Sequence, residues 1–501
     1  MPDTKLIGYA RLVERFALPA LPLPIIAVIA SAQRIRSFSR RGDQDIQQFP
    51  PRYEPEDTPL ADLQFALRYE GVNLQVLALL FAKRGAQDIQ PFVDANPQSV
   101  YARRLGYLYE WLTGETVRYA TPQRASYIQL LDANLQHCLN SGTRTAKFRV
   151  IDNLPGNRNF CPLVRRTQQL QATLAKDLAA QTQNTLAKYD RVLLQRAAAF
   201  LYLKETQSSF EVEREKPSPQ RSQRFADLLR EAENGTPLSE DRFVELQNAV
   251  VDPRFREASY RTEQNWIGDD LGYRKRVAFV PPRPEDTHEL MDGLVAISAS
   301  IHANPANLDP IIAAACLSFG FVFIHPFMDG NGRLHRYLIH EALSTAGFTP
   351  KGIILPVSAV ILTHLNEYVA ALEAFSKPLV ARTSWNPDTP AIPPTGNDAV
   401  YFRYFDATVQ AEFLAWALAR TIEHDLNDEI AFLLAFDRAR SALNSKLDWP
   451  AHSLDLFIRV VHQNDFKLSK NKRDAHFAWM TDEEEARFEN IVRGSFEQSV
   501  E

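Results

Sequence analysis

The chain has few cysteines, a small net charge and no long uninterrupted apolar run, and each shortage excludes a class of protein. Its three cysteines, Cys138, Cys161 and Cys316, lie far apart in 501 residues, which indicates neither a disulfide framework nor a zinc site and favours a reducing, cytoplasmic compartment. A net charge of −5 gives no global attraction to nucleic acid. The apolar run 18–32 imitates a secretory signal, but three prolines interrupt it and it is too short to cross a bilayer.

Phosphate-binding loops of the G-x-x-x-x-G-K-[ST] type and internal repeats are also missing. Apolar residues at helical spacing predict several helices within 61–140, and the absence of glycine and proline from 168–208 predicts helix there. The polar, proline-bearing stretch 36–60 indicates a long connection or an extended arm. Residues 148–162 are expected to form a strand and a turn, and 274–280 to belong to a hairpin.

The most informative stretch is 325–336, which reads HPFMDGNGRLHR. It follows an almost wholly apolar segment, 311–324, and precedes a segment of helical character, 334–346. A polar turn with two glycines between such segments predicts a loop that leads into a helix N-terminus. Backbone N–H groups at that position can hold phosphate.

The residue types in this stretch are suited to phosphate chemistry. His325 can accept a proton from a hydroxyl near neutral pH. Asp329 is a hard oxygen ligand for one position of Mg²⁺, whose other ligands would be phosphate oxygens and water. The glycines of 330–332 let the backbone turn its N–H groups toward an anion, and Arg333 and Arg336 can neutralise further phosphates. Together they predict a phosphate-transfer site.

The stretch resembles the signature of the Fic family, H-x-F-x-[DE]-G-N-G-R-x-x-R. The fixed positions are matched by His325, Phe327, Asp329, Gly330, Asn331, Gly332, Arg333 and Arg336. The resemblance implies a mainly α protein whose Fic-type helical core carries a small β-hairpin flap. It also implies Mg²⁺-dependent transfer of AMP from ATP to a Ser, Thr or Tyr hydroxyl of a protein. Gly332 stands where the kinase-like branch of the family has lysine, which favours nucleotidyl over phosphoryl transfer.

The resemblance also assigns roles within the site. His325 would deprotonate the target hydroxyl and Asp329 would hold Mg²⁺. Residues 330–332 would cradle the α- and β-phosphates, with both arginines on the outer phosphates. Tyr368 lies where the family often stacks adenine. Residues 260–282 resemble the flap, which could hold a target segment by strand addition.

A second match concerns control of the enzyme. Residues 209–214, SFEVER, resemble the family's inhibitory helix [ST]-x-x-x-E-[GN] in Ser209 and Glu213 and depart from it in Arg214. By this resemblance, Glu213 would pair with Arg336 and tilt ATP out of productive alignment, and small misplacements are costly for rate. In some members of the family the same glutamate supports removal of AMP.

We therefore expect three parts: an N-terminal helical domain of unknown role (1–180), a Fic-like core with the inhibitory helix near 205–214 (181–385), and a C-terminal helical module, with a winged-helix-like arrangement as one option (386–501). The expected partner is a hydroxyl-bearing protein, the chain itself included. No membrane partner is expected. Formation of homo-oligomers and binding of DNA at the basic stretch 467–473 are left as open alternatives. Two alternatives to AMP transfer also remain: a nucleotide-binding transcriptional or toxin–antitoxin-type regulator with a vestigial core, and an enzyme that chiefly removes AMP.

Overall fold

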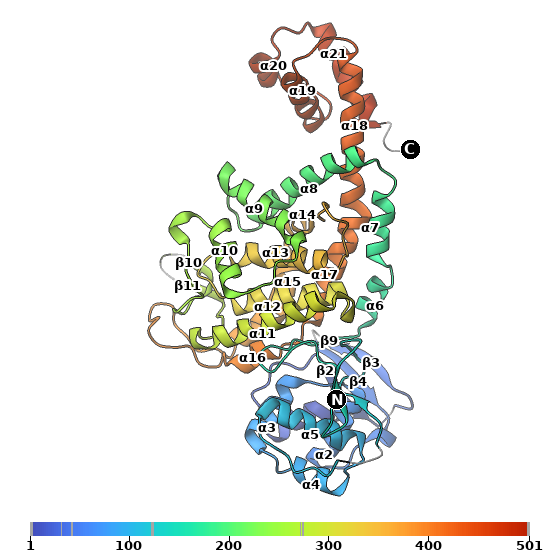
Figure 1. Cartoon of the computed structure of the whole chain (residues 1–501), viewed down its shortest axis with the longest axis vertical. Coiled ribbons are helices and arrows are strands. Elements are labelled where there is room, and N and C mark those ends of the chain that lie inside the picture. Colours follow the sequence, from blue (N-terminus) through green and yellow to red (C-terminus); the bar gives the residue numbers. More distant parts are fainter. Residues whose placement is uncertain are drawn as a thin grey trace.

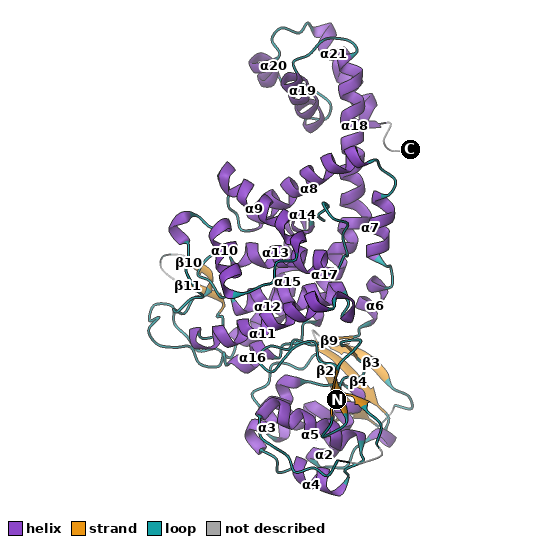
Figure 2. Ribbon diagram, in the orientation of Figure 1, coloured by secondary structure: helices purple, strands orange, loops and turns teal. Residues whose placement is uncertain are grey.

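The structure, a computed structural model, is mainly α-helical and elongated, with three parts following one another along its long axis (Figure 1). Among the described residues, strands occur in the N-terminal part and in one hairpin beside the central helices (Figure 2). The residues described are 4–31, 33–41, 44–121, 125–270, 272 and 275–497. Among these residues, the helices are all too short or too polar to span a membrane.

The N-terminal part combines helices with a four-stranded sheet of order β1-β2-β4-β3. Its strands are β1 (Thr4–Leu6), β2 (Ile25–Ala30), β3 (Ser37–Arg41) and β4 (Gln44–Phe49). Its helices are α1 (Gly8–Arg15), α2 (Pro59–Tyr69), α3 (Leu74–Arg84), α4 (Ile89–Ala95) and α5 (Val100–Thr113). A helical domain was expected from the sequence, and the structure adds this sheet to the helices, because the β-branched residues of β2 pair in parallel with β4. Much of the expected arm 36–60 is strand.

Five shorter strands follow before the central helices begin. They are β5 (Ile128–Gln129), β6 (Gln136–His137), β7 (Thr143–Thr145), β8 (Val150–Asp152) and β9 (Val164–Arg165). β8 lies between β5 and β7 in a three-stranded sheet. The strand expected within 148–162 is therefore present.

The central part is a bundle of helices. These are α6 (Gln168–Leu174), α7 (Leu178–Leu186), α8 (Arg191–Val212), α9 (Pro219–Glu231), α10 (Glu240–Val250), α11 (Pro284–Ala303), α12 (Pro310–Ile324), α13 (Asn331–Thr345), α14 (Val357–Thr363), α15 (Leu365–Val380), α16 (Ala399–Arg403) and α17 (Thr408–Arg420). The stretch 168–208 forms three helices rather than one. Asp177 and Asp190 break it, because each side chain accepts hydrogen bonds from the N–H groups of the helix that follows.

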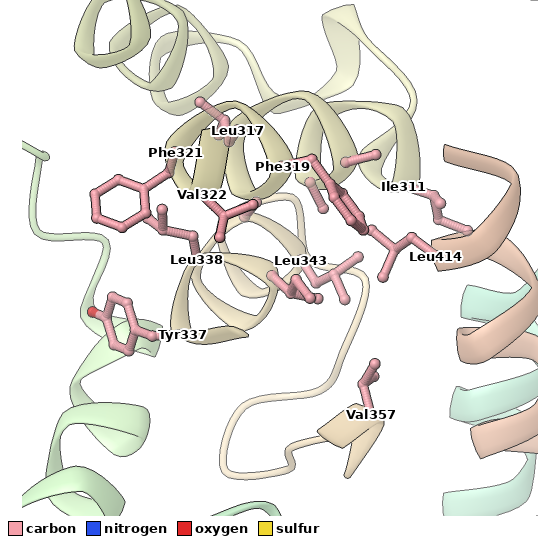
Figure 3. Close-up of a cluster of buried hydrophobic side chains, with 14 of the residues drawn as sticks. Ile311, Leu317, Phe319, Phe321, Val322, Tyr337, Leu338, Leu343, Val357 and Leu414 are labelled. Atoms are coloured by element: carbon pink, nitrogen blue, oxygen red, sulfur yellow. The ribbon is translucent and has the colours of Figure 1, made fainter. Parts of the chain in front are cut away.

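Helix α12 lies at the centre of this bundle. It is buried along nearly its whole length, as expected of a helix that is apolar on every side. It packs closely against α13, and Phe319 and Phe321 point from it into the surrounding side chains (Figure 3). The same hydrophobic core extends from Phe160 to Leu433, so the central part is larger than the expected 181–385 and includes α16 and α17.

The C-terminal module is joined to the core by one long helical rod. Helix α17 continues through a π-helical turn, Thr421–Asp425, into α18 (Leu426–Asn444). Helices α19 (Ala451–Gln463), α20 (Lys470–His476) and α21 (Asp482–Glu497) pack around a separate small core. No strand occurs among the described residues from 386 to 497, so the winged-helix-like option was wrong for this module.

The hairpin expected between 260 and 282 is present. Strands β10 (Ile267–Asp270) and β11 (Lys275–Phe279) pair antiparallel with an irregularity at Gly268. A side chain at Gly268 would overlap the Arg276 carbonyl, and its φ of +155° suits glycine. Phe279 anchors β11 in the core, while β10 is exposed. Three residues of the turn, 271, 273 and 274, lie outside the described residues.

Candidate active site

His325 ends α12 in a left-handed conformation, with φ 53° and ψ 57°. A non-glycine residue adopts this conformation at a cost of about 1–2 kcal/mol, so its surroundings must hold it. Its own N–H donates to the Phe321 carbonyl at 2.9 Å, and its carbonyl accepts from Arg261 Nε at 2.9 Å. The turn directs the chain from the buried helix into the motif loop.

The His325 imidazole is placed to act as a base. Nδ1 lies 3.1 Å from the Val322 carbonyl; because a carbonyl only accepts, Nδ1 carries the proton and Nε2 has a free lone pair. Burial, and then the nearby Arg261 charge, lower the pKa of His325 to about 4, against the opposing effects of the Val322 bond, Glu213 and Asp329. The ring is therefore neutral near pH 7.

Side chains within and beside the motif loop fix its shape. Asn331 accepts from the Phe327 N–H at 3.1 Å and donates to the Phe327 carbonyl at 2.7 Å. Asn265 donates to the same carbonyl at 2.9 Å. Glu257 accepts from the Met328 N–H at 2.8 Å. The Asn331 side chain thus braces the loop, so only its backbone is left for the predicted phosphate cradle.

Helix α13 begins at the loop, and the space beside Gly332 at its first turn is called the anion position below. The first N–H groups of a helix have no intrahelical acceptor and carry the positive end of the helix dipole. The Glu213 carboxylate fills this position: a side chain on Gly332 would overlap Glu213 Oε1. An internal carboxylate therefore lies where the sequence predicts a phosphate.

Arg336 is fully engaged by the end of α8. Its Nη1 donates to Glu213 Oε1 at 2.9 Å, its Nε to Ser209 Oγ at 2.8 Å, and its Nη2 to the Ser209 carbonyl at 2.6 Å. Only 1% of Arg336 is exposed. Burial raises the pKa of Glu213, but the Arg336 charge and hydrogen bond, with Arg333 and His325, outweigh it and lower the pKa. The residues of the predicted inhibitory contact are thus brought together.

The backbone conformation of Arg214 explains how the chain can depart from the inhibitory pattern at this position. Helix α8 ends at Val212, and Arg214 has φ 56°, the left-handed conformation that glycine and asparagine adopt most readily after a helix. The pattern's glycine or asparagine thus matches a backbone requirement, which Arg214 meets despite its side chain.

Arg333 is held by partners different from those of Arg336. Its Nη1 donates to Glu215 Oε2 at 3.1 Å and to the Val250 carbonyl at 3.0 Å, and its Nη2 donates to Asp329 Oδ1 at 2.8 Å. It is almost wholly buried. Each of the two glutamates therefore forms an ion pair with one arginine of the motif, Glu213 with Arg336 and Glu215 with Arg333.

Asp329 retains the chemistry that a Mg²⁺ ligand needs. Its bonds to Arg333 and to the Gly330 N–H, at 2.8 and 2.6 Å, both use Oδ1, and its side chain is 39% exposed. No group of three or more potential metal ligands occurs in the part of the chain that the structure describes. A single carboxylate fits an ion whose remaining ligands come from substrate phosphates and water.

Tyr368 is placed differently from the expectation. It is 5% exposed, its ring stacks on His335 at 5.9 Å, and it also packs against Phe413. Burial is the main cause that raises its pKa to about 12. Because His335 stacks on the ring and the residue belongs to the hydrophobic core, stacking on adenine does not fit this arrangement.

The structure gives contacts in or near the site to three residues that were not identified from the sequence. Glu215 is two residues beyond Glu213, and the acidic pattern at 211, 213 and 215 is the one signal that could have indicated it. Glu205 is buried and contacts Ser358 and His340; its spacing of four from Ser209 was available but unused. Arg261 carries no distinguishing signal in the sequence.

Part of the chain is similar to known proteins. Residues 237–343 match the Fic/DOC family. A protein adenylyltransferase Fic of Nematostella vectensis is 38% identical over 91 residues, 18% of this chain and 19% of that protein. Its counterpart in Drosophila virilis is 35% identical over 116 residues, 23% of this chain and 21% of that protein. The chain thus spans about a fifth of the length of these curated relatives.

Among solved structures, a Fic family protein of Desulfovibrio desulfuricans G20 is 18% identical, with a TM-score of 0.36 over 62% of this chain and 85% of that one. In this helical protein the start of α13 holds the Glu213 carboxylate, and His325 lies at the other end of the motif loop. Over residues 237–343 the chain is similar to the Fic/DOC family.

Proposed function

We propose that this protein transfers AMP from ATP to a hydroxyl group of a protein and that Glu213 holds the activity in check. The observation that carries the proposal is the anion position at the start of α13, one short loop from the neutral imidazole of His325. The naming of the matched relatives as adenylyltransferases supports the same activity.

In the proposed reaction, Nε2 of His325 accepts the proton of the target hydroxyl. The oxygen attacks the α-phosphorus of ATP, the bond to the bridging oxygen of the β-phosphate breaks, and pyrophosphate leaves. The N–H groups at the start of α13 stabilise the phosphates, and Arg336 neutralises the outer phosphate once it is released from Glu213. Bound to Asp329, Mg²⁺ would supply charge neutralisation of the phosphates.

The hairpin and the basic stretch 467–473 bear on the partners of the protein. The exposed strand β10 offers an edge to an extended target segment. A cytoplasmic location and homo-oligomer formation remain predictions. For DNA binding at 467–473, the charges offer little support, because Lys467 pairs with Glu489 at 2.7 Å and Arg473 pairs with Glu485 at 2.9 Å.

The test separates AMP transfer from its alternatives. Purified Glu213→Gly protein is incubated with ATP labelled on the α- or on the γ-phosphate, and modified residues, its own included, are located by mass spectrometry. Label from the α-phosphate alone, lost in Glu213→Gly/His325→Ala, is expected. Label from the γ-phosphate, or none while ATP binds, would overturn the proposal, and release of AMP from a pre-modified protein would favour the reverse reaction.

A further inference from the structure

Arg261 lies in the loop before the hairpin, and its guanidinium joins three segments of the chain. Its Nε donates to the carbonyl of His325 at 2.9 Å, and its Nη2 donates to the carbonyl of Pro282, just after β11, at 2.5 Å. Its Nη1 donates to the carbonyl of Glu263 at 3.1 Å. Its backbone N–H donates to the Pro326 carbonyl at 2.8 Å. One residue therefore ties the end of α12 to the foot of the hairpin.

The environment of Arg261 is unusual for a cation. Only 3% of the residue is exposed, and no carboxylate among the described residues lies within ion-pair distance of its guanidinium. Burial lowers the pKa of Arg261 to about 10. A buried charge costs free energy unless it is hydrogen-bonded, and here backbone carbonyls, including one at the negative end of α12, supply the bonds.

The three carbonyls belong to the parts that must cooperate in the proposed reaction. His325 carries the base, and Pro282 follows the hairpin whose β10 edge is proposed to present the target hydroxyl. The strained left-handed conformation of His325 persists only where its surroundings over-determine it. A planar fork with donors in fixed directions does this better than a single flexible ammonium group.

We infer that Arg261 is a positioning residue for AMP transfer: it sets the imidazole of His325 and the foot of the hairpin in fixed relation, so that the base meets the hydroxyl the hairpin presents. The inference rests on the proposed function. Arg261 touches neither nucleotide nor target, so its role is exerted through His325 and Pro282. Binding of ATP, which depends on α13, is independent of it.

The test uses the full-length chain carrying Glu213→Gly, so that activity is measurable, with Arg261→Lys and Arg261→Gln added in turn. Lysine keeps the charge and loses the fork; glutamine loses the charge. Misplacement by about 1 Å can cost about 10²-fold in rate, so kcat should fall by about that factor in both variants, with the KM for ATP unchanged. Arg254→Lys, at an exposed residue paired with Asp252, is the matched control and should leave kcat unaltered.

The pH profile separates positioning from mere structural support. The charged groups that face His325 are Arg261, Glu213 and Asp329, and Glu213 is absent from this background. Loss of the Arg261 charge removes a cause that lowers the pKa of His325. The acid limb of the kcat profile should therefore move to higher pH in Arg261→Gln, and stay in place in Arg261→Lys.

Each result decides the inference. If both folded variants show a lower melting temperature but unaltered kcat and pH profile, Arg261 is only structural and the inference fails. If Arg261→Gln does not fold, Arg261→Lys decides alone through its kcat. Absence of AMP transfer by the Glu213→Gly protein with Arg261 intact is a different outcome, because it overturns the proposed function itself.

Discussion

Oε1 of Glu213 lies 2.9 Å from Nη1 of Arg336, so the carboxylate that ends α8 neutralises the arginine proposed for the outer phosphate. The same carboxylate fills the anion position beside Gly332. Phosphate and Glu213 cannot occupy this space together. In this conformation ATP would therefore bind without the alignment that transfer requires.

Arg214→Gly should strengthen the inhibition. Arg214 holds a left-handed conformation that costs a non-glycine residue about 1–2 kcal/mol. Glycine adopts it freely, so the turn that carries Glu213 to Arg336 becomes more favourable. Residual AMP transfer should fall several-fold and the melting temperature should rise. Higher activity in Arg214→Gly would contradict the interpretation that the pattern has glycine or asparagine at this position because the backbone is left-handed there.

Glu215→Gln should partly release the enzyme. Glu215 pairs with Arg333 at 3.1 Å and with Arg221 at 2.9 Å, which ties the segment after α8 to the motif. Without the charge, that segment should loosen while Glu213 is retained, and AMP transfer should rise a few-fold, by less than in Glu213→Gly. Glu211→Gln, at an exposed residue in the last turn of α8, is the matched control. Equal rates in the two variants would show that Glu215 has no part in inhibition.

Glu205 offers a way to release α8 without touching the nucleotide site. Fully buried, it accepts from the Ser358 N–H at 2.9 Å and pairs with His340 Nε2 at 2.8 Å. It lies one helical turn before Ser209, on the face that reaches Arg336. Removing one partner of a buried pair costs about 3–5 kcal/mol, so Glu205→Gln should lower the melting temperature and raise AMP transfer together.

Ser358→Ala, which removes one hydrogen bond to Glu205, is the milder companion variant and should shift both quantities in the same direction by less. A lower melting temperature with unaltered AMP transfer would mean that the Glu205 contacts support the fold without controlling α8.

The docking of α8 should weaken in acid. Burial raises the pKa of both Glu205 and Glu213, but their cationic and hydrogen-bonding partners outweigh it and lower both values. A carboxyl whose folded pKa is depressed contributes stability above its unfolded pKa of about 4.3, and that stability is lost as pH falls through the folded pKa. The melting temperature should thus decline below about pH 4, less steeply in Glu213→Gln. An identical decline in the two proteins would exclude Glu213 as a contributor.

Much of the site was predictable because it is local in the sequence. The stretch 325–336 contains the turn, the helix start and both arginines, and the hairpin at 267–279 follows from β-like composition after a glycine-bearing turn. Both were confirmed as elements. The contact of Glu213 with Arg336 spans 123 residues and was expected through the family resemblance rather than from spacing.

The remaining features depend on contacts between distant residues, which pattern alone does not show. Whether Arg333 faces a phosphate or Glu215, and whether Tyr368 is open or covered by His335, is decided by packing. The parallel pairing of β2 with β4 likewise joins separate segments, so the apolar run at 25–30 was not recognised as a central strand.

The most direct test of the account is the single-turnover rate of AMP transfer at saturating ATP, measured for the wild type and for Glu213→Gly with equal nucleotide occupancy. Replacing the glutamate should raise the rate at least tenfold, which corresponds to about 1.4 kcal/mol of activation free energy. His325→Ala should abolish transfer in both proteins. Equal rates in the two proteins, or no transfer by Glu213→Gly while ATP is bound, would contradict the claim that this carboxylate blocks a working active site.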